Sequence, residues 1–232
     1  NCFVVTSING VVSGGDSRGE QDIVLCKIDS SGEQEWLKQL ANYNTTGHDG
    51  YASVVADNSG NIILSYMTDA AISGGANIGD IDVVLFKLDN CGQILYSRQD
   101  IQVSGPDDDI GPLVGVDGSN NIFKLNYVPG NFSVQKFDDT LATRVYQTYI
   151  STQAGLEVLG YDYAVDESGY GYLAYVTNSE VSGGQSYSGL ADIVLTRIDP
   201  GGNVEWVCEN SSFNTPGWEY QPRIAVKGDY IY

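Results

Sequence analysis

The sequence predicts an all-β protein: a β-propeller of four-stranded antiparallel blades, with about four blades present. The chain of 232 residues contains 28 Gly and 16 Tyr, a composition that favours strands and tight turns over helices. Two sequence elements recur at a spacing of 60 residues, and a period of this size indicates a propeller, a solenoid or a repeat array. Each period holds four short strand-like runs, which is the content of a propeller blade.

The first repeated element is Asp-Ile-Val-Leu-Cys-Lys-Ile-Asp at residues 22–29. It recurs at 82–89 and 192–199, and a shorter version occupies 133–138. In each copy a turn and then an aromatic residue follow, so we expect the four aromatic residues to hold equivalent places in the blades. They are Trp36, Tyr96, Tyr146 and Trp206.

The second repeated element begins at residues 54–63, with copies at 114–123, 164–172 and 225–232. It contains a turn of the Asp-Asn-Ser-Gly type, and the Asn and Gly residues of such turns tolerate the positive φ of tight hairpins. The elements together predict the strands of one complete blade, from the inner strand to the rim: 52–57, 62–67, 82–89 and 93–98.

The repeats place one propeller region over residues 1–232. We expect repeat boundaries at about 1–60, 61–120, 121–169 and 170–229, with both ends of the chain inside a blade. Tyr230–Tyr232 and Asn1–Phe3 occupy the same place in the repeat. Because one strand position cannot hold both segments, we expect a portion of a larger ring of roughly six to eight blades.

The motifs resemble a known repeat. Ala-Val-Asp-x-Ser-Gly-Asn-Ile-Tyr, followed by Ser-Gly-Gly and Asp-Ile-Val-Leu-x-Lys-Ile-Asp-x-x-Gly, is similar to the SBBP-type β-propeller repeat, and residues 111–138 resemble the related NHL-type blade. The resemblance covers the whole chain and implies a propeller of secreted, cell-surface or virion-associated proteins, usually without an assigned activity. Residues 29–36 are also similar to the blade signature of pyrroloquinoline-quinone enzymes, where the similarity lies in a structural turn.

Charge and cysteine content exclude several function classes. The chain has 11 Lys and Arg against 30 Asp and Glu, a formal net charge of −19, whereas nucleic acids and anionic membranes require a basic surface. No apolar run approaches the roughly 18 residues of a membrane span. The four cysteines match no zinc-binding spacing, and we favour free thiols over disulfides because the cysteines do not fall at equivalent repeat positions.

The long, variable connections between blade strands predict the functional face, because binding residues concentrate on loops held by a rigid scaffold. His48, the only histidine, aligns with Trp218 in the loop of another repeat. Trp218 has the side chain to stack on a sugar or a partner, with burial between blades as the alternative. Together with Tyr161 and Tyr187, these two residues are our candidate ligand-binding residues on this face.

Asp107, Asp108 and Asp109 form the most acidic cluster. Carboxylate oxygens suit Ca²⁺, but the alternating spacing of a calcium loop is missing, so a solvated acidic loop is favoured over a calcium site. We expect no other cofactor.

These observations favour a non-catalytic propeller, an extracellular or cell-surface module (alternatively a virion-surface one) for binding, adhesion or assembly. The expected partner is a protein or a glycan, with a homo-oligomer or surface assembly left open. The alternative is a propeller enzyme, acting on glycans or resembling quinone-dependent dehydrogenases. An enzyme should direct polar side chains from the inner strands into the channel, and here only Arg223 and Tyr163 are polar exceptions among Val, Ala and Ile.

Overall fold

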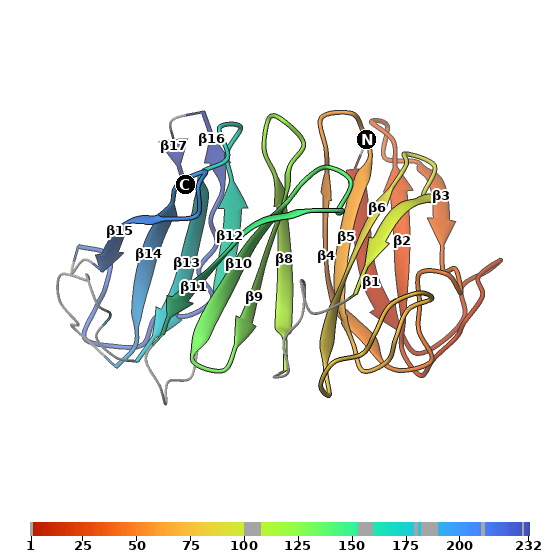
Figure 1. The fold of residues 1–232 in the computed structure, drawn as a ribbon, viewed down its shortest axis with the longest axis horizontal. Coiled ribbons are helices and arrows are strands. Elements are labelled where there is room, and N and C mark those ends of the chain that lie inside the picture. Colours follow the sequence, from red (N-terminus) through yellow and green to blue (C-terminus); the bar gives the residue numbers. More distant parts are fainter. Residues whose placement is uncertain are drawn as a thin grey trace. The chain divides into compact units, whose positions relative to one another are not determined.

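The computed structural model confirms an all-β chain (Figure 1). It describes residues 2–99, 108–152, 160–178, 181, 190–209, 212–228 and 230–232. Within these ranges no helix long and apolar enough to cross a membrane is found. The strands are β1 (Cys2–Ile8), β2 (Asp22–Ile28), β3 (Gln34–Lys38), β4 (Asp49–Ala56), β5 (Ile62–Thr68), β6 (Asp82–Leu88), β7 (Ile94–Arg98), β8 (Ile110–Val116), β9 (Ile122–Val128), β10 (Asn131–Phe137), β11 (Arg144–Ser151), β12 (Tyr161–Val165), β13 (Gly171–Thr177), β14 (Asp192–Ile198), β15 (Val204–Glu209), β16 (Val226–Lys227) and β17 (Tyr230–Ile231).

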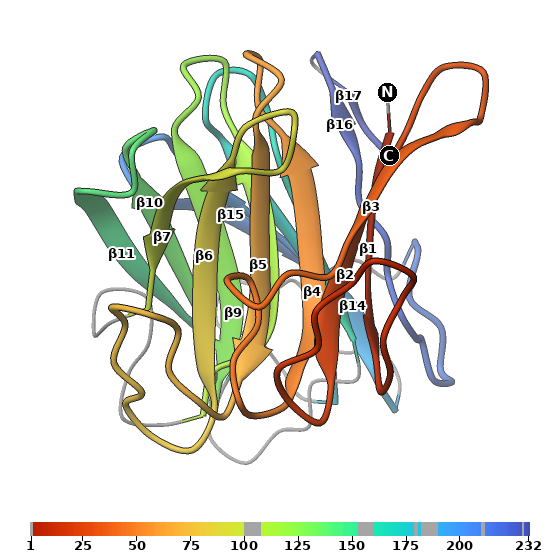
Figure 2. The ribbon, with the colours of Figure 1, turned by 90° about the vertical axis from the view of Figure 1, so that its right-hand side faces the viewer.

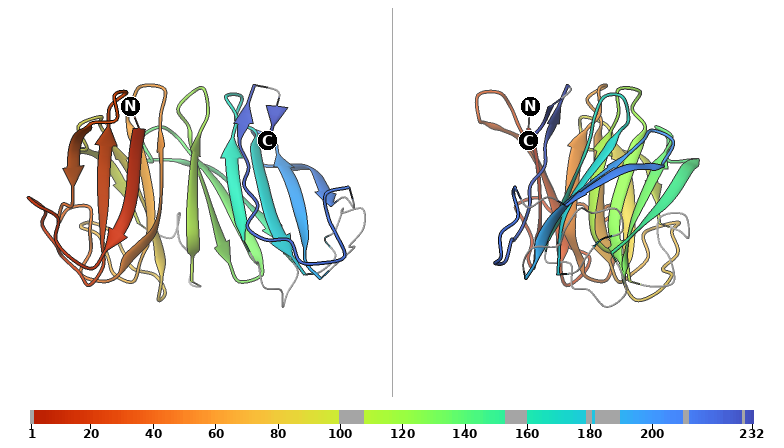
Figure 3. Two further views of the ribbon diagram at one scale, coloured as in Figure 1. Left: turned by 180° about the vertical axis from the view of Figure 1, so that it is seen from behind. Right: turned by 90° about the vertical axis from the view of Figure 1, so that its left-hand side faces the viewer.

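The strands form separate sheets, each built from consecutive strands, as the turned views in Figure 3 also show. We call them blade 1 (β1-β2-β3), blade 2 (β4-β5-β6-β7), blade 3 (β8-β9-β10-β11) and blade 4 (β12-β13-β14-β15), followed by the two-stranded hairpin β16-β17. The strands pair with their neighbours in antiparallel orientation. Four strands per blade are therefore confirmed for blades 2, 3 and 4, whereas the larger ring stays a prediction.

The chain divides into two compact units. Unit 1 consists of Asn1–Val114, Asn126–Val128 and Thr140–Thr143, and unit 2 of the remainder through Tyr232. Unit 1 holds blades 1 and 2, unit 2 holds blade 4 and the β16-β17 hairpin, and blade 3 contributes residues to both.

The four repeated aromatic residues occupy equivalent positions, as predicted. Each lies opposite a cationic residue of the strand before the last in its blade, and a register shift follows directly after each pair. The pairs are Lys27 with Trp36, Lys87 with Tyr96, Lys136 with Tyr146, and Arg197 with Trp206.

A single kind of hairpin turn explains the repeated aspartates. In each turn one carboxylate oxygen accepts the backbone N–H groups two and four residues further on, which fixes a tight turn without help from the rest of the fold. The residues that do so are Asp29, Asp57, Asp89, Asp117, Asp166 and Asp199.

The core of unit 1 lies on the middle strands of the blades. Every residue of β5 and β6 is buried, and Tyr66 stacks on Phe86 with ring centroids 6.0 Å apart. A buried ion pair joins Lys87 Nζ to Asp57 Oδ2 at 3.0 Å. The outer strand β7 is more exposed, which fits the sequence expectation of a polar rim.

Candidate functional site

The long connections of unit 1 gather at one edge of its blades (Figure 2). The loops that follow β1, β3 and β5 lie at the lower edge in this view, and the short hairpin turns lie at the upper edge. This arrangement agrees with the sequence-based division into a face of tight turns and a face of long loops.

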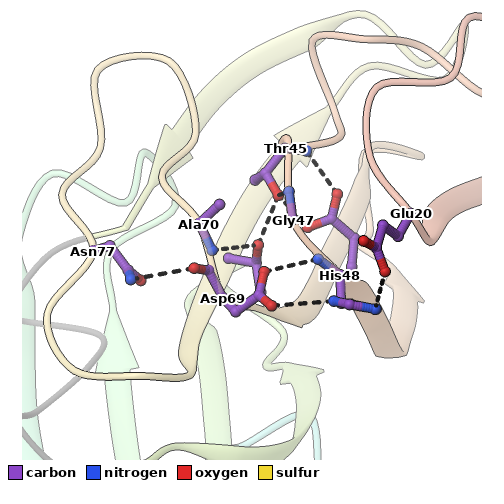
Figure 4. Close-up of polar contacts among 9 residues, drawn as sticks. Glu20, Thr45, Gly47, His48, Asp69, Ala70 and Asn77 are labelled. Carbon is purple, nitrogen blue, oxygen red and sulfur yellow. Dashed lines mark hydrogen bonds and ion pairs between the residues drawn. The ribbon is translucent and has the colours of Figure 1, made fainter.

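His48 lies on this loop edge, one residue before β4 begins. A parallel bridge to Gln21 fixes its backbone. The backbone N–H of His48 donates to Asp69 Oδ1 at 2.8 Å, and the ring Nδ1 lies 3.1 Å from Asp69 Oδ2. On the other side, ring Nε2 lies 3.0 Å from Glu20 Oε2 (Figure 4). The imidazole is therefore held between two carboxylates.

A buried network beneath His48 supports this loop. Asp49 is fully buried and accepts hydrogen bonds from the backbone N–H and the hydroxyl of Thr45, at 2.6 and 2.7 Å. The Thr45 hydroxyl lies 2.8 Å from that of Thr68 and accepts the Gly47 N–H (Figure 4). Because the residues on both sides of His48 are tied to the sheet, its ring has a defined position.

The carboxylates around His48 change the pKa of its imidazole. The hydrogen bond to Asp69, reinforced by the charges of Glu20 and Asp69, raises the pKa of His48 above its ordinary value of 6.5. Partial burial opposes the charged form of Asp69, but the hydrogen bonds from His48 outweigh it and hold the pKa of Asp69 below 3.8. Both shifts favour the ion pair of an imidazolium with a carboxylate.

A pocket of about 240 Å³ opens beside the imidazole. Tyr51 stands at this pocket with 75% of its surface exposed and a φ of 52°. That conformation is uncommon for a residue other than glycine. It occurs at the register shift between Gly50 and Ser53. The lining residues are Gln21, His48, Gly50, Tyr51, Met67, Thr68, Asp69 and Ile81.

This geometry suits His48 to exchange a proton with a bound ligand. Asp69 occupies Nδ1, so Nε2 is the ring atom left for a ligand. The Glu20 carboxylate that contacts Nε2 belongs to a side chain that is 79% exposed, so a ligand can displace it at little cost. An imidazole with a raised pKa is a proton donor near neutral pH.

Unit 2 repeats this loop with a tryptophan in the place of the histidine. Trp218 forms a parallel bridge with Ala191, as His48 does with Gln21. Thr215 donates its backbone N–H and its hydroxyl to Glu219, at 3.0 and 2.6 Å, as Thr45 does to Asp49. The sequence alignment of His48 with Trp218 is thus confirmed. Trp218 is 46% exposed, and its ring stacks on that of Tyr220 with centroids 6.1 Å apart and an interplanar angle of 9°.

The other candidate residues lie elsewhere. Tyr161 is on β12, where its ring packs edge-on against Phe132 at 5.1 Å, and burial raises its pKa above the usual range. Tyr187 and Asp107 lie outside the described residues. His48 and Trp218 are therefore the two candidates that the described structure places on exposed parts of the loops.

The acidic cluster is tied into the fold where it is described. Asp108 Oδ1 accepts the Ile81 N–H at 3.2 Å, and the Asp109 N–H donates to Ile81 O at 3.1 Å. Asp109 is buried and accepts a hydrogen bond from Asn126 Nδ2. Among the described residues no group of three or more His, Cys, Asp or Glu side chains gathers as metal ligands do. A calcium site at Asp107–Asp109, the less favoured alternative to a solvated acidic loop, stays a hypothesis.

Sequence reasoning missed Glu20, Asp69 and Tyr51. Glu20 and Asp69 come from two different loops, and only the parallel bridge at His48 brings them to one imidazole. The Gly50-Tyr51 pair, directly before a strand-like run, was the one local signal of an irregular strand.

No family model matches the chain, and no curated protein matches its sequence. Among solved structures, the polysaccharide lyase Uly1 is similar, with a TM-score of 0.53 and 12% identity over 93% of this chain and 56% of that one. An exo-β-1,3-galactanase from Phanerochaete chrysosporium, solved with β-1,3-galactotriose, has a TM-score of 0.45 and 10% identity over 89% of this chain and 54% of that one. The chain spans about half the length of these structures.

These comparisons correct our main functional expectation. At 12% identity the likeness to the lyase shows a shared β-propeller fold. The expected non-catalytic module for adhesion or assembly is contradicted, because the similar structure with a TM-score of 0.53 is that of an enzyme, a polysaccharide lyase. This finding agrees better with the alternative, a propeller enzyme that acts on glycans. The names of the similar structures do not bear on the expected SBBP-type resemblance or on the extracellular location, which stay predictions.

Proposed function

We propose that this chain is part of a β-propeller protein that acts on a polysaccharide, with the pocket at His48 as the site that binds a sugar unit and donates a proton. The observation that carries the proposal is the imidazole itself: Asp69 fixes Nδ1 at 3.1 Å, Nε2 meets only the exposed Glu20 carboxylate at 3.0 Å, and His48 lines a pocket of about 240 Å³. The shared fold with a polysaccharide lyase supports the choice of substrate class.

The pocket offers the three kinds of contact that sugar recognition uses. The exposed ring of Tyr51 provides an apolar face for a pyranose ring. Gln21 and Thr68 provide polar groups at the pocket wall. His48 then donates its Nε2 proton to the oxygen of the bond that breaks, and Asp69 stabilises the imidazolium before transfer.

A polysaccharide panel tests this function. Wild-type protein is incubated with neutral and with uronic-acid polysaccharides. New reducing ends and the ultraviolet absorbance of unsaturated sugars are measured, which separates hydrolysis from elimination. We expect one class of substrate to be cleaved and the rate to fall at least ~100-fold in His48→Ala, the range that general acid catalysis contributes.

The matched control is Gln93→Ala, which changes an exposed side chain next to a hairpin turn at the opposite edge of unit 1. Its rate should equal that of the wild type. Cleavage that His48→Ala leaves intact would place the activity elsewhere, and no cleavage of any glycan in the panel would overturn the proposed function.

A further inference from the structure

The inner strands of blades 2, 3 and 4 share an irregularity near their beginning, where one residue adopts a left-handed backbone. In blade 2 this residue is Tyr51, with a φ of 52°, at the register shift between Gly50 and Ser53. Gly111 follows Tyr51 by one period of 60 residues and has a φ of 59°. The strand register places Gly160 of blade 4 at the same point, with a φ of 150°. The conformation is therefore a feature of the repeat.

Glycine is the residue that suits this conformation. A residue without a Cβ adopts positive φ freely, whereas a bulky side chain does so rarely. Blades 3 and 4 use glycine, so the fold itself requires no side chain at this place. Gln221, which holds this place in the loop of Trp218, also has a positive φ, of 45°. The repeat therefore imposes the backbone shape on either kind of residue, and a tyrosine in blade 2 is strained by it.

The contacts of Tyr51 do not explain why a tyrosine stands here. Within the described part of the chain its side chain makes no hydrogen bond, ion pair or ring contact, and 75% of the residue is exposed. The repeated aromatic residues of the blades are different, since Trp36 donates to the carbonyl oxygen of Asn90 at 3.3 Å. Strain that no contact offsets persists where function requires it, so Tyr51 points to a role in binding.

Tyr51 lines the same pocket as His48, and the charges around this pocket restrict what the ring can bind. None of the described lining residues is a lysine or an arginine. The charged groups are His48 with the Asp69 carboxylate at 3.1 Å and the Glu20 carboxylate at 3.0 Å. A sugar carboxylate would meet two carboxylates and one imidazole, and like charges placed together disfavour binding. The pocket therefore suits a neutral sugar.

We propose that Tyr51 is the specificity-determining residue of the His48 pocket, where its ring stacks on the face of a neutral sugar unit. The proposal rests on the proposed function for the class of ligand, and it adds the residue that selects the sugar and the charge of the unit selected. A strand irregularity re-aims the side chain that it carries. The strained backbone is thus the means by which the ring is presented to the pocket.

Two substitutions separate the strain from the ring. Tyr51→Ala and Tyr51→Gly both remove the ring, but only glycine relieves the strain of a positive φ. We therefore expect Tyr51→Gly to unfold at a higher urea concentration than Tyr51→Ala. Tyr96 is the matched control, because it is an exposed tyrosine of β7 with no positive φ. There the order should reverse, since glycine weakens an ordinary strand.

Affinity electrophoresis measures sugar binding without relying on cleavage. Each variant runs in native gels that contain a neutral polysaccharide (xylan, galactan or glucan) or a uronic-acid polysaccharide (pectate or alginate). A neutral polysaccharide should retard the wild type and Tyr51→Phe equally, because both keep the ring. The dissociation constant should rise at least ~10-fold in Tyr51→Ala and Tyr51→Gly, the effect of removing a central aromatic contact.

Four results would overturn the proposal. They are equal retardation of wild type and Tyr51→Ala, stronger binding of uronic-acid than of neutral polysaccharides, no binding of any polysaccharide in the gels, and lower stability of Tyr51→Gly than of Tyr51→Ala. The proposed function fails separately. Cleavage that depends on His48 but binding that ignores Tyr51 would sink this inference alone, whereas binding through Tyr51 without cleavage would sink the proposed function alone.

Discussion

The single histidine of this chain owes its properties to two carboxylates that lie far from it in sequence. Asp69 follows β5 and Glu20 precedes β2. Their carboxylate oxygens nevertheless lie 3.1 Å and 3.0 Å from the Nδ1 and Nε2 atoms of the His48 ring. Because Asp69 also accepts the His48 backbone N–H at 2.8 Å, it fixes both the backbone and the ring. Glu20 contacts the ring but not the backbone of His48, and its side chain is more exposed than that of Asp69.

This difference predicts unequal effects on the histidine pKa. Asp69→Asn should lower the pKa of His48 more than Glu20→Gln does, because the hydrogen bond to Asp69 is the largest cause of the shift. Proton NMR measures both values directly, since one histidine gives one Hε1 resonance to follow with pH. Equal shifts in the two variants would show that net charge, not the hydrogen bond, sets the pKa.

The same pair predicts a pH window for stability. Folding raises the pKa of His48 above 6.5, so its contribution is complete below pH 6.5 and is lost as the pH rises through the raised value. Folding lowers the pKa of Asp69 below 3.8, so its contribution is complete above pH 3.8 and is lost as the pH falls. Urea unfolding should therefore show that Asp69→Asn is most costly between these two pH values and less costly at alkaline pH, where the imidazole is neutral and only the backbone hydrogen bond of His48 still depends on Asp69.

At the scale of the blade, the aspartates of the hairpin turns have two roles. In the six turns named above an aspartate organises the hairpin, but in blades 2 and 3 the second oxygen of Asp57 and of Asp117 also neutralises a buried lysine. Asp57 Oδ2 lies 3.0 Å from Lys87 Nζ, and Asp117 Oδ2 lies 3.4 Å from Lys136 Nζ. A buried charge without its partner is strongly destabilising. A turn whose aspartate also pairs with a buried lysine therefore contributes more to stability than a turn whose aspartate only organises the hairpin.

Two equivalent substitutions test this difference. Asp57→Ala removes both the turn hydrogen bonds and the partner of a lysine that is 5% exposed, and should lower the free energy of unfolding by about 3 kcal/mol or more. Asp29→Ala removes the same turn hydrogen bonds without exposing a buried charge, and its loss should be clearly smaller. Urea denaturation of both variants would contradict this account if the losses were equal.

The elements were predictable from sequence because their signals are local. The expected strand 62–67 is observed as Ile62–Thr68, and 82–89 as Asp82–Leu88, since the Asp-x-x-Gly turns bound each strand without long-range contacts. The expected inner strand 52–57 begins earlier, at Asp49, because the bridge at His48 and the register shift after Gly50 extend it.

The candidate site was only half predictable. His48 and Trp218 stood out as unusual residues at one repeat position. Their partners did not, because Glu20 and Asp69 reach His48 through loop conformations that no repeat pattern encodes. Tyr51 becomes exposed through a strand irregularity, whereas Tyr161, which looked like a loop residue in the sequence, packs on Phe132.

At the scale of the whole molecule, the net charge of −19 constrains the substrate. An anionic polysaccharide meets a repulsive field that salt screens, whereas a neutral one does not. We therefore expect kcat/KM for a uronic-acid polysaccharide to rise as ionic strength increases from low to physiological values, and kcat/KM for a neutral polysaccharide to stay constant. A fall with salt on an acidic substrate would reveal a local basic site that outweighs the net charge.

The measurement that most directly tests the central claim, glycan action at the His48 pocket, is an NMR titration of the single histidine with oligosaccharides of the best-cleaved substrate. The account predicts that the Hε1 resonance of His48 shifts saturably, with a half-saturation close to KM, and that its pKa changes as the sugar displaces Glu20 from Nε2. Cleavage of the substrate with no change in this resonance would contradict it.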